Sequence, residues 1–281
     1  PSQAMSFLIA VAVTRTLVTK WLLSGDNAFS YPVVYSTISC VATIIVILGI
    51  KVLGEVEIHM LKREHLTAFA WVALLTALDM GATNIAVESI SLALQQTIKA
   101  SLPAMVVVLE FATQGKYHGK VVYLSLIPLT AGPVLAAMGS STVDFDLQGS
   151  LWMVAAVAAA AVKSVKLYSA IQTLRKDMGV MSFLLWLELS TFVVLLPWSI
   201  INGECEAILS YSKLTSVSNW SIVTAASLLG GLRAFATTLV LRYADPISLA
   251  SVNVLIQITT VVASILLFNT KLSFMLVVGT V

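Results

Sequence analysis

The sequence is dominated by a succession of apolar stretches, each about as long as a membrane-spanning helix. A helix that crosses the hydrocarbon core of a bilayer needs about 20 mostly apolar residues. Nine stretches meet this length, at 5–23, 34–54, 66–87, 88–111, 121–140, 149–172, 181–201, 219–241 and 246–268. A tenth begins after Lys271, where ten residues remain, so we expect it to be incomplete in this sequence. Only 11% of the residues are charged, against about 25% in a soluble domain. The sequence therefore predicts an all-α polytopic membrane protein.

The basic residues of the connections fall mostly on one side of the predicted membrane. If the chain crosses at each stretch, eight lie on one side: Lys51, Lys62, Arg63, Lys116, Lys120, Arg175, Lys176 and Arg242. Lys213 and Lys271 lie on the other side, together with acidic residues such as Asp26, Asp144 and Glu204. Cytoplasmic loops carry an excess of Lys and Arg. This asymmetry predicts that the first side faces the cytosol and that both ends of a ten-helix chain lie there.

One short segment occurs twice. Residues 90–93 and 247–250 both read Ile-Ser-Leu-Ala, and they begin the fourth and ninth predicted spans. Two copies five spans apart have opposite orientations in the membrane, as in carriers whose binding site lies between two inverted halves. We therefore expect two five-helix repeats, 1–140 and 141–281, the second incomplete at its C-terminus. Together they would form one transport domain.

Several basic residues lie within the predicted spans. They are Arg15, Lys20, Lys99, Lys163, Lys166 and Arg233, whereas the clear mid-span acids are Asp79 and Glu188. A Lys or Arg at the centre of a span costs about 2.5–3.5 kcal/mol on insertion scales, so such residues usually face a wet cavity or a partner. The excess of positive charge favours an anionic ligand such as phosphate, which binds point charges and fork-like donors.

Two lysines are candidates for this site. Lys99 lies near the middle of the fourth span, where its side chain cannot easily reach either membrane surface; the alternative is an ion pair with Asp79. Lys163 and Lys166 share one helical face, and Lys163 is the deeper of the two. Lys166 is expected to extend to the interface instead.

Two further basic residues are candidates for the anion site, and each also has a structural interpretation. Arg233 is central in the eighth span and follows two glycines that permit close helix packing; it could instead pair with Glu188. Lys20 lies near the end of the first span, so its ammonium group could also reach the membrane surface.

Other classes of function have little support. The three histidines fall in connections without a metal-ligand pattern, and no phosphate-binding glycine loop or nucleophile elbow occurs. The net charge of +2 gives no reason to expect nucleic acid as a partner. We therefore expect a carrier rather than an enzyme, with the lipid bilayer and a small anionic substrate as partners and with no cofactor or metal. Gly-rich and Ala-rich faces could also pair two chains, so a homodimer is an open prediction.

Nearly the whole chain resembles the triose-phosphate translocator and nucleotide-sugar transporter group of the drug/metabolite transporter superfamily. The resemblance is carried by TKWLL followed by FSYPVVYS, by ALDMGATNIAVESISLALQQTIKAS, by AVKSVKLYSAIQTLRKDMG and by ADPISLASVNVLIQITTVVASILLF. It implies ten helices in two inverted halves and alternating-access exchange. It also implies a phosphorylated substrate, either a sugar phosphate exchanged for phosphate or a nucleotide sugar exchanged for its nucleoside monophosphate.

The resemblance assigns roles to several residues. Lys99 matches the fourth-span lysine that binds substrate phosphate in plastid members, and Lys163 falls where sixth-span basic residues occur. Lys20 matches the lysine of a first-span Asn-Lys motif, although Thr19 replaces the asparagine. In the ninth span Ile256 and Gln257 stand where plastid members have a phosphate-binding Lys-Arg pair.

The missing ninth-span pair favours an endomembrane carrier, in the Golgi or endoplasmic reticulum, over a plastid exchanger. Gln257 would then hydrogen-bond a sugar or base, unless it only packs between helices. The predicted function is antiport of a nucleotide sugar or sugar phosphate against a nucleoside monophosphate or phosphate. The alternative is a drug/metabolite carrier for a non-phosphorylated solute.

Overall fold

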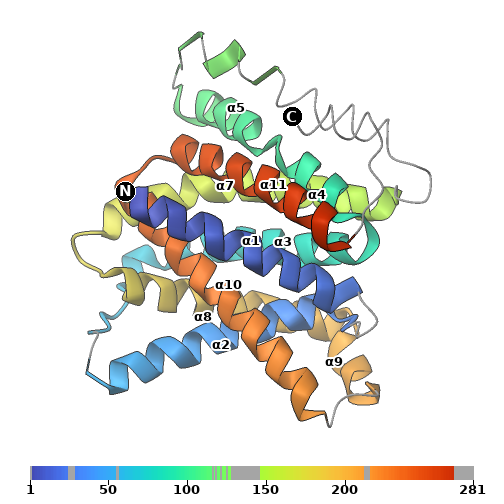
Figure 1. The fold of residues 1–281 in the computed structure, drawn as a ribbon. Helices are drawn as coiled ribbons and strands as arrows, with labels where there is room; N and C mark the ends of the chain where they lie inside the picture. Colours follow the sequence, from blue (N-terminus) through green and yellow to red (C-terminus); the bar gives the residue numbers. More distant parts are fainter. Residues whose placement is uncertain are drawn as a thin grey trace.

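The computed structural model describes residues 2–24, 29–54, 57–115, 117, 119–120, 122–124, 126–127, 146–211 and 216–268. Within these residues every regular element is helical (Figure 1). The longer helices are α1 (Ser2–Ser24), α2 (Pro32–Val52), α3 (Leu66–Ser89), α4 (Leu92–Lys99), α5 (Leu102–Gln114), α7 (Leu147–Leu174), α8 (Val180–Ile201), α10 (Val217–Tyr243) and α11 (Pro246–Phe268). Short helical segments are η1 (Arg63–His65), α9 (Glu204–Ala207) and η2 (Ile208–Ser210).

Six of the described helices are long and apolar enough to cross a membrane, namely α1, α2, α3, α7, α8 and α10. The ninth predicted span corresponds to α11. The chain is thus an all-α polytopic membrane protein, as its sequence predicted. Most of the fifth predicted span, the boundary between the repeats at 140–141 and the whole tenth span lie outside the described residues. The count of ten helices and the two repeats therefore stay predictions.

The fourth predicted span differs from the expectation of one continuous helix over 88–111. Helix α3 continues to Ser89, and Ile90 has extended backbone, so α4 begins only at Leu92. Helix α4 ends at Lys99, and α5 starts after a turn at 100–101. Pro103 lies in the first turn of α5, where its missing N–H leaves no hydrogen bond unmade. The single continuous helix over 88–111 was therefore a wrong prediction.

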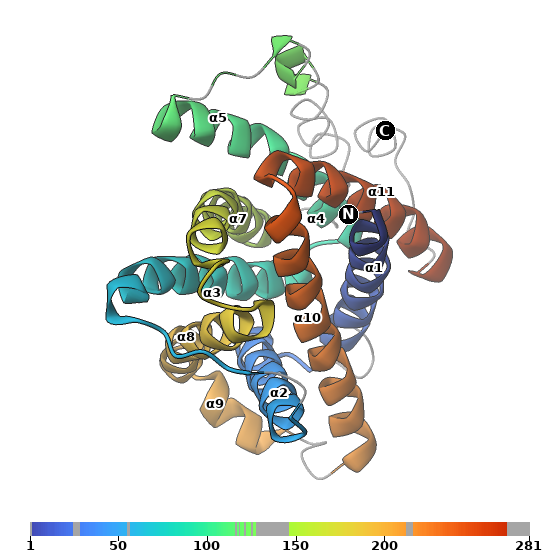
Figure 2. The same ribbon diagram turned by 90° about the vertical axis from the view of Figure 1, so that its left-hand side faces the viewer.

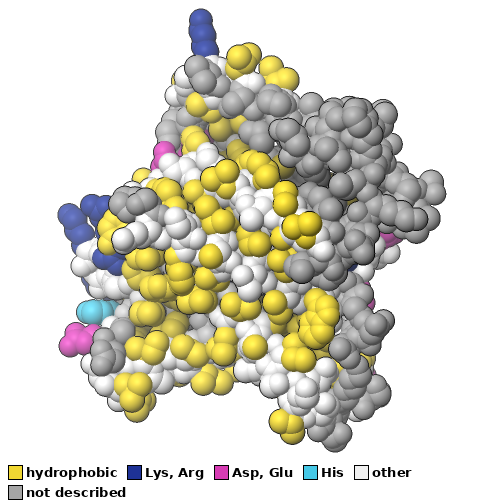
Figure 3. Space-filling view, viewed as in Figure 1, with side chains coloured by type: hydrophobic (Ala, Val, Ile, Leu, Met, Phe, Trp, Pro, Cys, Tyr) yellow, Lys and Arg dark blue, Asp and Glu magenta, His cyan; other side chains and the backbone are white. Residues whose placement is uncertain are grey.

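The two ends of the bundle are chemically different. At one end the connection before α3 contacts the connection before α8, because Lys62 and Asp177 lie 4.0 Å apart. Arg242 at the end of α10 donates a hydrogen bond to the carbonyl of Arg175 at this same end. Basic side chains gather along this edge of the molecule in Figure 3. At the opposite end, Glu204 contacts the start of α2. Lys213 and Lys271, predicted for that end, lie outside the described residues, and which end faces the cytosol stays a prediction.

The helices pack around α3 and α10. Helix α3 lies between α7 and α8, and α10 packs against α1 and α2 (Figure 2). An inverted repeat five spans apart would relate α3 to α10, α7 to α1 and α8 to α2. If the repeat is present, the contact between α3 and α7 should have a counterpart between α10 and α1. Likewise, the contact between α3 and α8 should have a counterpart between α10 and α2. All four contacts are present, which supports the predicted repeat.

The outer surface of the bundle is apolar. Ile45 on α2, Leu151 on α7 and Val193 on α8 are all exposed. Hydrophobic side chains also spread across the face formed by α1, α10 and α11 (Figure 3). An exposed apolar surface of this extent marks contact with lipid. The polar and charged groups described below lie instead within the bundle.

Candidate functional site

A cavity of about 180 Å³ lies inside the helix bundle. Residues of α1, α2, α3, α4, α5, α7, α8, α10 and α11 line it, so both predicted repeats contribute. Its charged lining residues are four basic ones and two acidic ones, namely Arg15, Lys99, Lys163, Arg233, Asp79 and Glu188. With both carboxyl groups counted as ionised, the cavity has a formal excess of two positive charges. An excess of positive charge within a membrane protein fits an anionic ligand.

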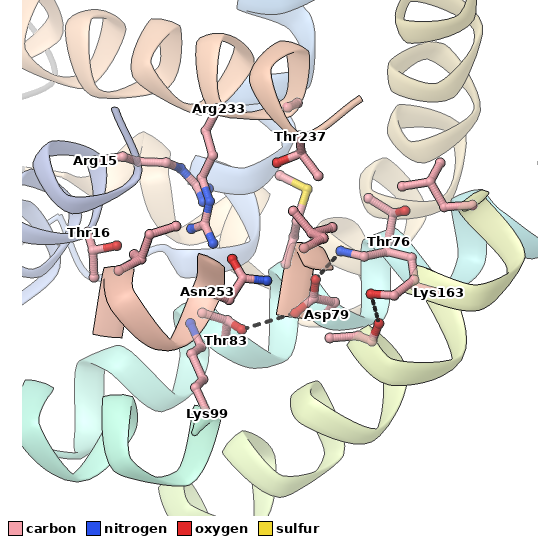
Figure 4. A pocket seen from close by; sticks show the side chains of 18 of the residues that line it. Arg15, Thr16, Thr76, Asp79, Thr83, Lys99, Lys163, Arg233, Thr237 and Asn253 are labelled. Atoms are coloured by element: carbon pink, nitrogen blue, oxygen red, sulfur yellow. Dashed lines mark hydrogen bonds and ion pairs between the residues drawn. The ribbon is translucent and has the colours of Figure 1, made fainter. Parts of the chain in front are cut away.

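The break in the fourth span positions Lys99. Ser101 donates two hydrogen bonds to the carbonyl of Ile98, from its backbone N–H at 3.2 Å and from its hydroxyl at 2.8 Å, so the chain turns directly after Lys99. Lys99 is the last residue of α4, where the partial negative charge of the helix end stabilises a cation. Its side chain points into the cavity (Figure 4).

Two arginines point toward the same part of the cavity as Lys99. Arg15 comes from α1 and Arg233 from α10, so the three basic groups belong to three helices (Figure 4). Gly230 of α10 lies beside Arg15, since a Cβ at Gly230 would be in ordinary contact, 3.4 Å from Nε of Arg15. Nε of Arg15 is buried and has no hydrogen-bond partner among the described residues. A buried guanidinium with an unused donor is costly unless a ligand completes it.

The acid in the middle of the third span pairs with a different lysine from the one that the sequence suggested. Asp79 forms an ion pair with Lys163 of α7, and the hydroxyl of Thr83 lies 3.5 Å from the other oxygen of Asp79 (Figure 4). Both partners keep about 20% of their side-chain surface exposed. Lys99 makes no ion pair within the described part of the chain. The alternative interpretation of Lys99 as the partner of Asp79 is therefore wrong for this conformation.

Arg233 does not form the ion pair with Glu188 that the sequence left open as an alternative. Arg233 and Glu188 both line the cavity, but no ion pair joins them in the described structure. The basic groups of Arg15, Lys99 and Arg233 consequently remain available to a ligand, while Lys163 is occupied by Asp79.

Helix α11 contributes uncharged polar groups to the cavity. Asn253 and Gln257 lie one helical turn apart and both line it, as does Ile256. Gln257 is only 6% exposed, and its Oε1 has no hydrogen-bond partner among the described residues. The ninth span thus presents amides to the cavity and no cation.

Lys20 lies outside the set of cavity-lining residues. Its ammonium group donates hydrogen bonds to the carbonyls of Val87 at 2.7 Å and Ile90 at 3.0 Å. These carbonyls belong to the C-terminal end of α3, where a cation satisfies unpaired oxygens and interacts favourably with the helix dipole. The structure thus places Lys20 at a helix end rather than in the cavity.

Sequence reasoning did not select every residue that the cavity brings together. Arg15 was recognised as a basic residue within a span but was not among the predicted binding residues, and Asn253 was not considered at all. The available signal for Arg15 was its central position in the first span, where a cation usually faces a wet cavity or a partner. No local pattern marks Asn253, because its position depends on how α11 packs across the cavity.

A profile of the triose-phosphate transporter family matches residues 7–281. The chain belongs to this family. Among curated proteins of Arabidopsis thaliana, it is similar to two probable sugar phosphate/phosphate translocators. The first is 26% identical over 66% of this chain and 60% of its own length. The second is 27% identical over 69% of this chain and 54% of its own length. A chloroplastic glucose-6-phosphate/phosphate translocator is 24% identical over 88% of this chain and 63% of its own length. The chain thus spans less than two thirds of the length of these relatives.

The fold is also found in a solved crystal structure, with a TM-score of 0.65 at 14% sequence identity. That match covers 99% of this chain and 91% of the other, so nearly the whole chain shares the architecture. Membership of the family confirms the resemblance found in the sequence. The relatives include a chloroplast protein and give no support to the predicted Golgi or endoplasmic reticulum location.

Proposed function

We propose that the protein exchanges a phosphorylated organic anion, preferably a sugar phosphate, for phosphate across its membrane. The observation that carries this proposal is the convergence of Arg15, Lys99 and Arg233 in one cavity without a paired carboxylate in the described structure. Arginine binds phosphate oxygens through its planar fork of donors, and lysine binds them as a point charge. The relatives named as sugar phosphate/phosphate translocators support the same class of substrate.

The origin of the three basic groups suggests how binding drives exchange. Arg15 and Lys99 belong to the first predicted repeat, and Arg233 belongs to the second. A phosphate held by all three would draw the two halves together around the site, as in alternating access. An empty cavity with a formal excess of two positive charges would resist closing, because the like charges would be brought into a drier environment. This resistance predicts coupled exchange rather than leak.

Lys163 and Gln257 have secondary roles in this proposal. Lys163 forms an ion pair with Asp79, so it is not a free ligand, and the pair adds no net charge to the cavity. Gln257 would bind the uncharged part of the substrate from α11. A role for Lys20 would be indirect, because its ammonium group fixes the end of α3.

The size of the cavity favours a compact substrate. At about 180 Å³ it is smaller than the roughly 300–1,000 Å³ of pockets that hold drug-sized ligands. A sugar phosphate therefore suits this conformation better than a nucleotide sugar. A nucleotide sugar remains the second candidate, because α11 replaces the Lys-Arg pair of plastid members with Ile256 and Gln257 and would leave room for a base or second sugar. A non-phosphorylated solute is third, because it would leave the three cations unmatched.

Counterflow uptake into liposomes tests the proposal directly. Liposomes with the full-length protein are preloaded with phosphate, UMP, GMP or CMP, and labelled sugar phosphates or nucleotide sugars are offered outside. We expect uptake of a sugar phosphate that depends on internal phosphate. Uptake that depends on one nucleoside monophosphate would establish the second candidate, and no uptake of any anion would refute the proposal.

Single substitutions then test the site. Lys99→Gln and Arg233→Gln should each weaken exchange by at least about tenfold, since each removes a charged hydrogen bond worth roughly 1.5–3 kcal/mol. Lys166→Gln is the matched control, because Lys166 is exposed on α7 and does not line the cavity. Normal exchange in both Lys99→Gln and Arg233→Gln would refute the role of these cations in substrate binding.

The location of the protein is open to a separate test. The missing ninth-span pair is the only ground for an endomembrane location, so that location remains a proposal. Microscopy of the full-length protein with organelle markers would decide it.

A further inference from the structure

Helix α11 presents two amide side chains to the cavity with unused hydrogen-bonding capacity. Gln257 is more than nine-tenths buried, and its Oε1 has no partner among the described residues. Asn253 lies one turn earlier on the same face and points toward the region where Arg15, Lys99 and Arg233 meet (Figure 4). No hydrogen bond joins the Asn253 side chain to the described part of the protein. A buried amide oxygen without a partner is rare and costly, so Gln257 points to a ligand that completes it, with the partly exposed Asn253 beside it.

The chemistry of these amides matches hydroxyl groups better than carboxylates. An amide offers both a donor and an acceptor, and a hydroxyl also offers both. A carboxylate only accepts, so it could pair with the amide N–H groups but would leave the amide oxygens without a donor. A cation at the same position would have the opposite preference, because it has no acceptor and pairs with carboxylates.

The charge balance of the cavity leads to the same preference. The formal excess of two positive charges matches a phosphate monoester, which carries about −1.5 to −2 at neutral pH. A carboxylate on the same molecule would add a further negative charge. The remaining cation, Lys163, is held by Asp79, so the added charge would have no free partner among the described lining residues. A carboxylate left unpaired in such a site would weaken the binding of esters that carry one relative to esters that do not.

We propose that Asn253 and Gln257 bind the hydroxyl groups of the substrate's carbon part and select phosphate monoesters with an uncharged, hydroxylated part over those that carry a carboxylate. This inference rests on the proposed transport of phosphorylated anions and deepens it, since it names the substrate class. The specificity lies in α11, while the affinity for phosphate lies in Arg15, Lys99 and Arg233.

Glycerol 3-phosphate and 3-phosphoglycerate form a matched pair of probes, because one carries a hydroxymethyl group where the other carries a carboxylate. Each competes against labelled phosphate in counterflow into phosphate-loaded liposomes that contain the full-length protein. We expect glycerol 3-phosphate to reach half-inhibition at a concentration at least about tenfold lower than 3-phosphoglycerate.

Substitutions at one position separate charge from shape. Gln257→Lys should reduce that preference by at least about tenfold, because it supplies a partner for the carboxylate. Gln257→Leu has a similar size without charge, so it should weaken glycerol 3-phosphate more than inorganic phosphate and should not improve 3-phosphoglycerate. Thr259→Val is the control on α11, because Thr259 is exposed and bonds only to its own helix.

The outcomes distinguish this inference from the proposed function. If phosphate counterflow occurs but the two esters compete equally in the unmodified protein, the hydroxyl preference is wrong while phosphate exchange stands. An unchanged ratio in a transport-competent Gln257→Lys would likewise overturn the role of α11. If phosphate gives no counterflow and neither ester binds, the proposed function itself fails.

Discussion

Removal of the Asp79 carboxylate is the most informative perturbation of the cavity. Asp79→Asn keeps the shape of the side chain but leaves Lys163 without its ion-pair partner. Breaking a fully buried pair costs about 3–5 kcal/mol, and exposed pairs are worth about 0.2–1 kcal/mol. Because both side chains keep about 20% of their surface exposed, we expect a loss of about 1–3 kcal/mol in the free energy of unfolding.

The same substitution should strengthen the binding of phosphate. In Asp79→Asn the ammonium group of Lys163 becomes a fourth free cation in the cavity. A tenfold lower dissociation constant for phosphate would return about 1.4 kcal/mol of stability at saturating ligand. Phosphate should therefore stabilise Asp79→Asn more than it stabilises the unmodified protein.

A double-mutant cycle provides the assay. Unfolding in mixed detergent micelles is measured for the unmodified protein, Asp79→Asn, Lys163→Gln and the double variant, each with and without phosphate. The double variant should be less destabilised than the sum of the single variants, with a coupling of about 1–3 kcal/mol. Coupling below about 0.3 kcal/mol, or a phosphate effect no larger in Asp79→Asn, would refute the reasoning.

Three further predictions concern helix packing and helix ends. Gly231→Ala should destabilise the bundle by about 1–3 kcal/mol, because its Cβ would lie 3.0 Å from two carbons of Thr43 and closer still to the hydroxyl. Gly230→Ala is the control, because its Cβ would meet only ordinary contacts. Equal thermal stability of the two variants would contradict this packing. Glu204→Ala should cost about 1 kcal/mol, because the carboxylate accepts the N–H groups that begin α2, and Glu204→Gln should cost less. Burial raises the pKa of Glu204, despite the hydrogen bonds that favour its charged form. The unmodified protein should therefore gain stability relative to Glu204→Gln as the pH falls through that raised pKa. The reverse trend in pH-dependent melting would contradict this. Lys20→Met should lower the melting temperature without changing the affinity for phosphate, and a selective loss of affinity would return Lys20 to the substrate site.

Much of the architecture follows from local sequence patterns. The lengths of the apolar stretches predicted α1, α2, α3, α7, α8, α10 and α11 to within a few residues, because the thickness of a bilayer fixes the length of a spanning helix. The repeated Ile-Ser-Leu-Ala segment predicted two inverted halves, and the matching contacts of α3 and α10 support that prediction. The apolar run over 88–111 concealed the turn at 100–101, directly after Lys99.

The sequence predicted that basic residues outnumber acidic ones inside the bundle, but not which basic residue pairs with which acid. Sequence alone showed more basic than acidic residues within the spans, and that excess already favoured an anion. The tertiary structure decided that Asp79 pairs with Lys163 rather than Lys99, that Arg15 joins Lys99 and Arg233, and that Lys20 binds the end of α3. These outcomes depend on how each helix is rotated about its axis and how deeply it lies against its neighbours. Hydrophobicity and spacing place a charge at a depth in the membrane, whereas only helix packing brings residues far apart in sequence within reach of one another.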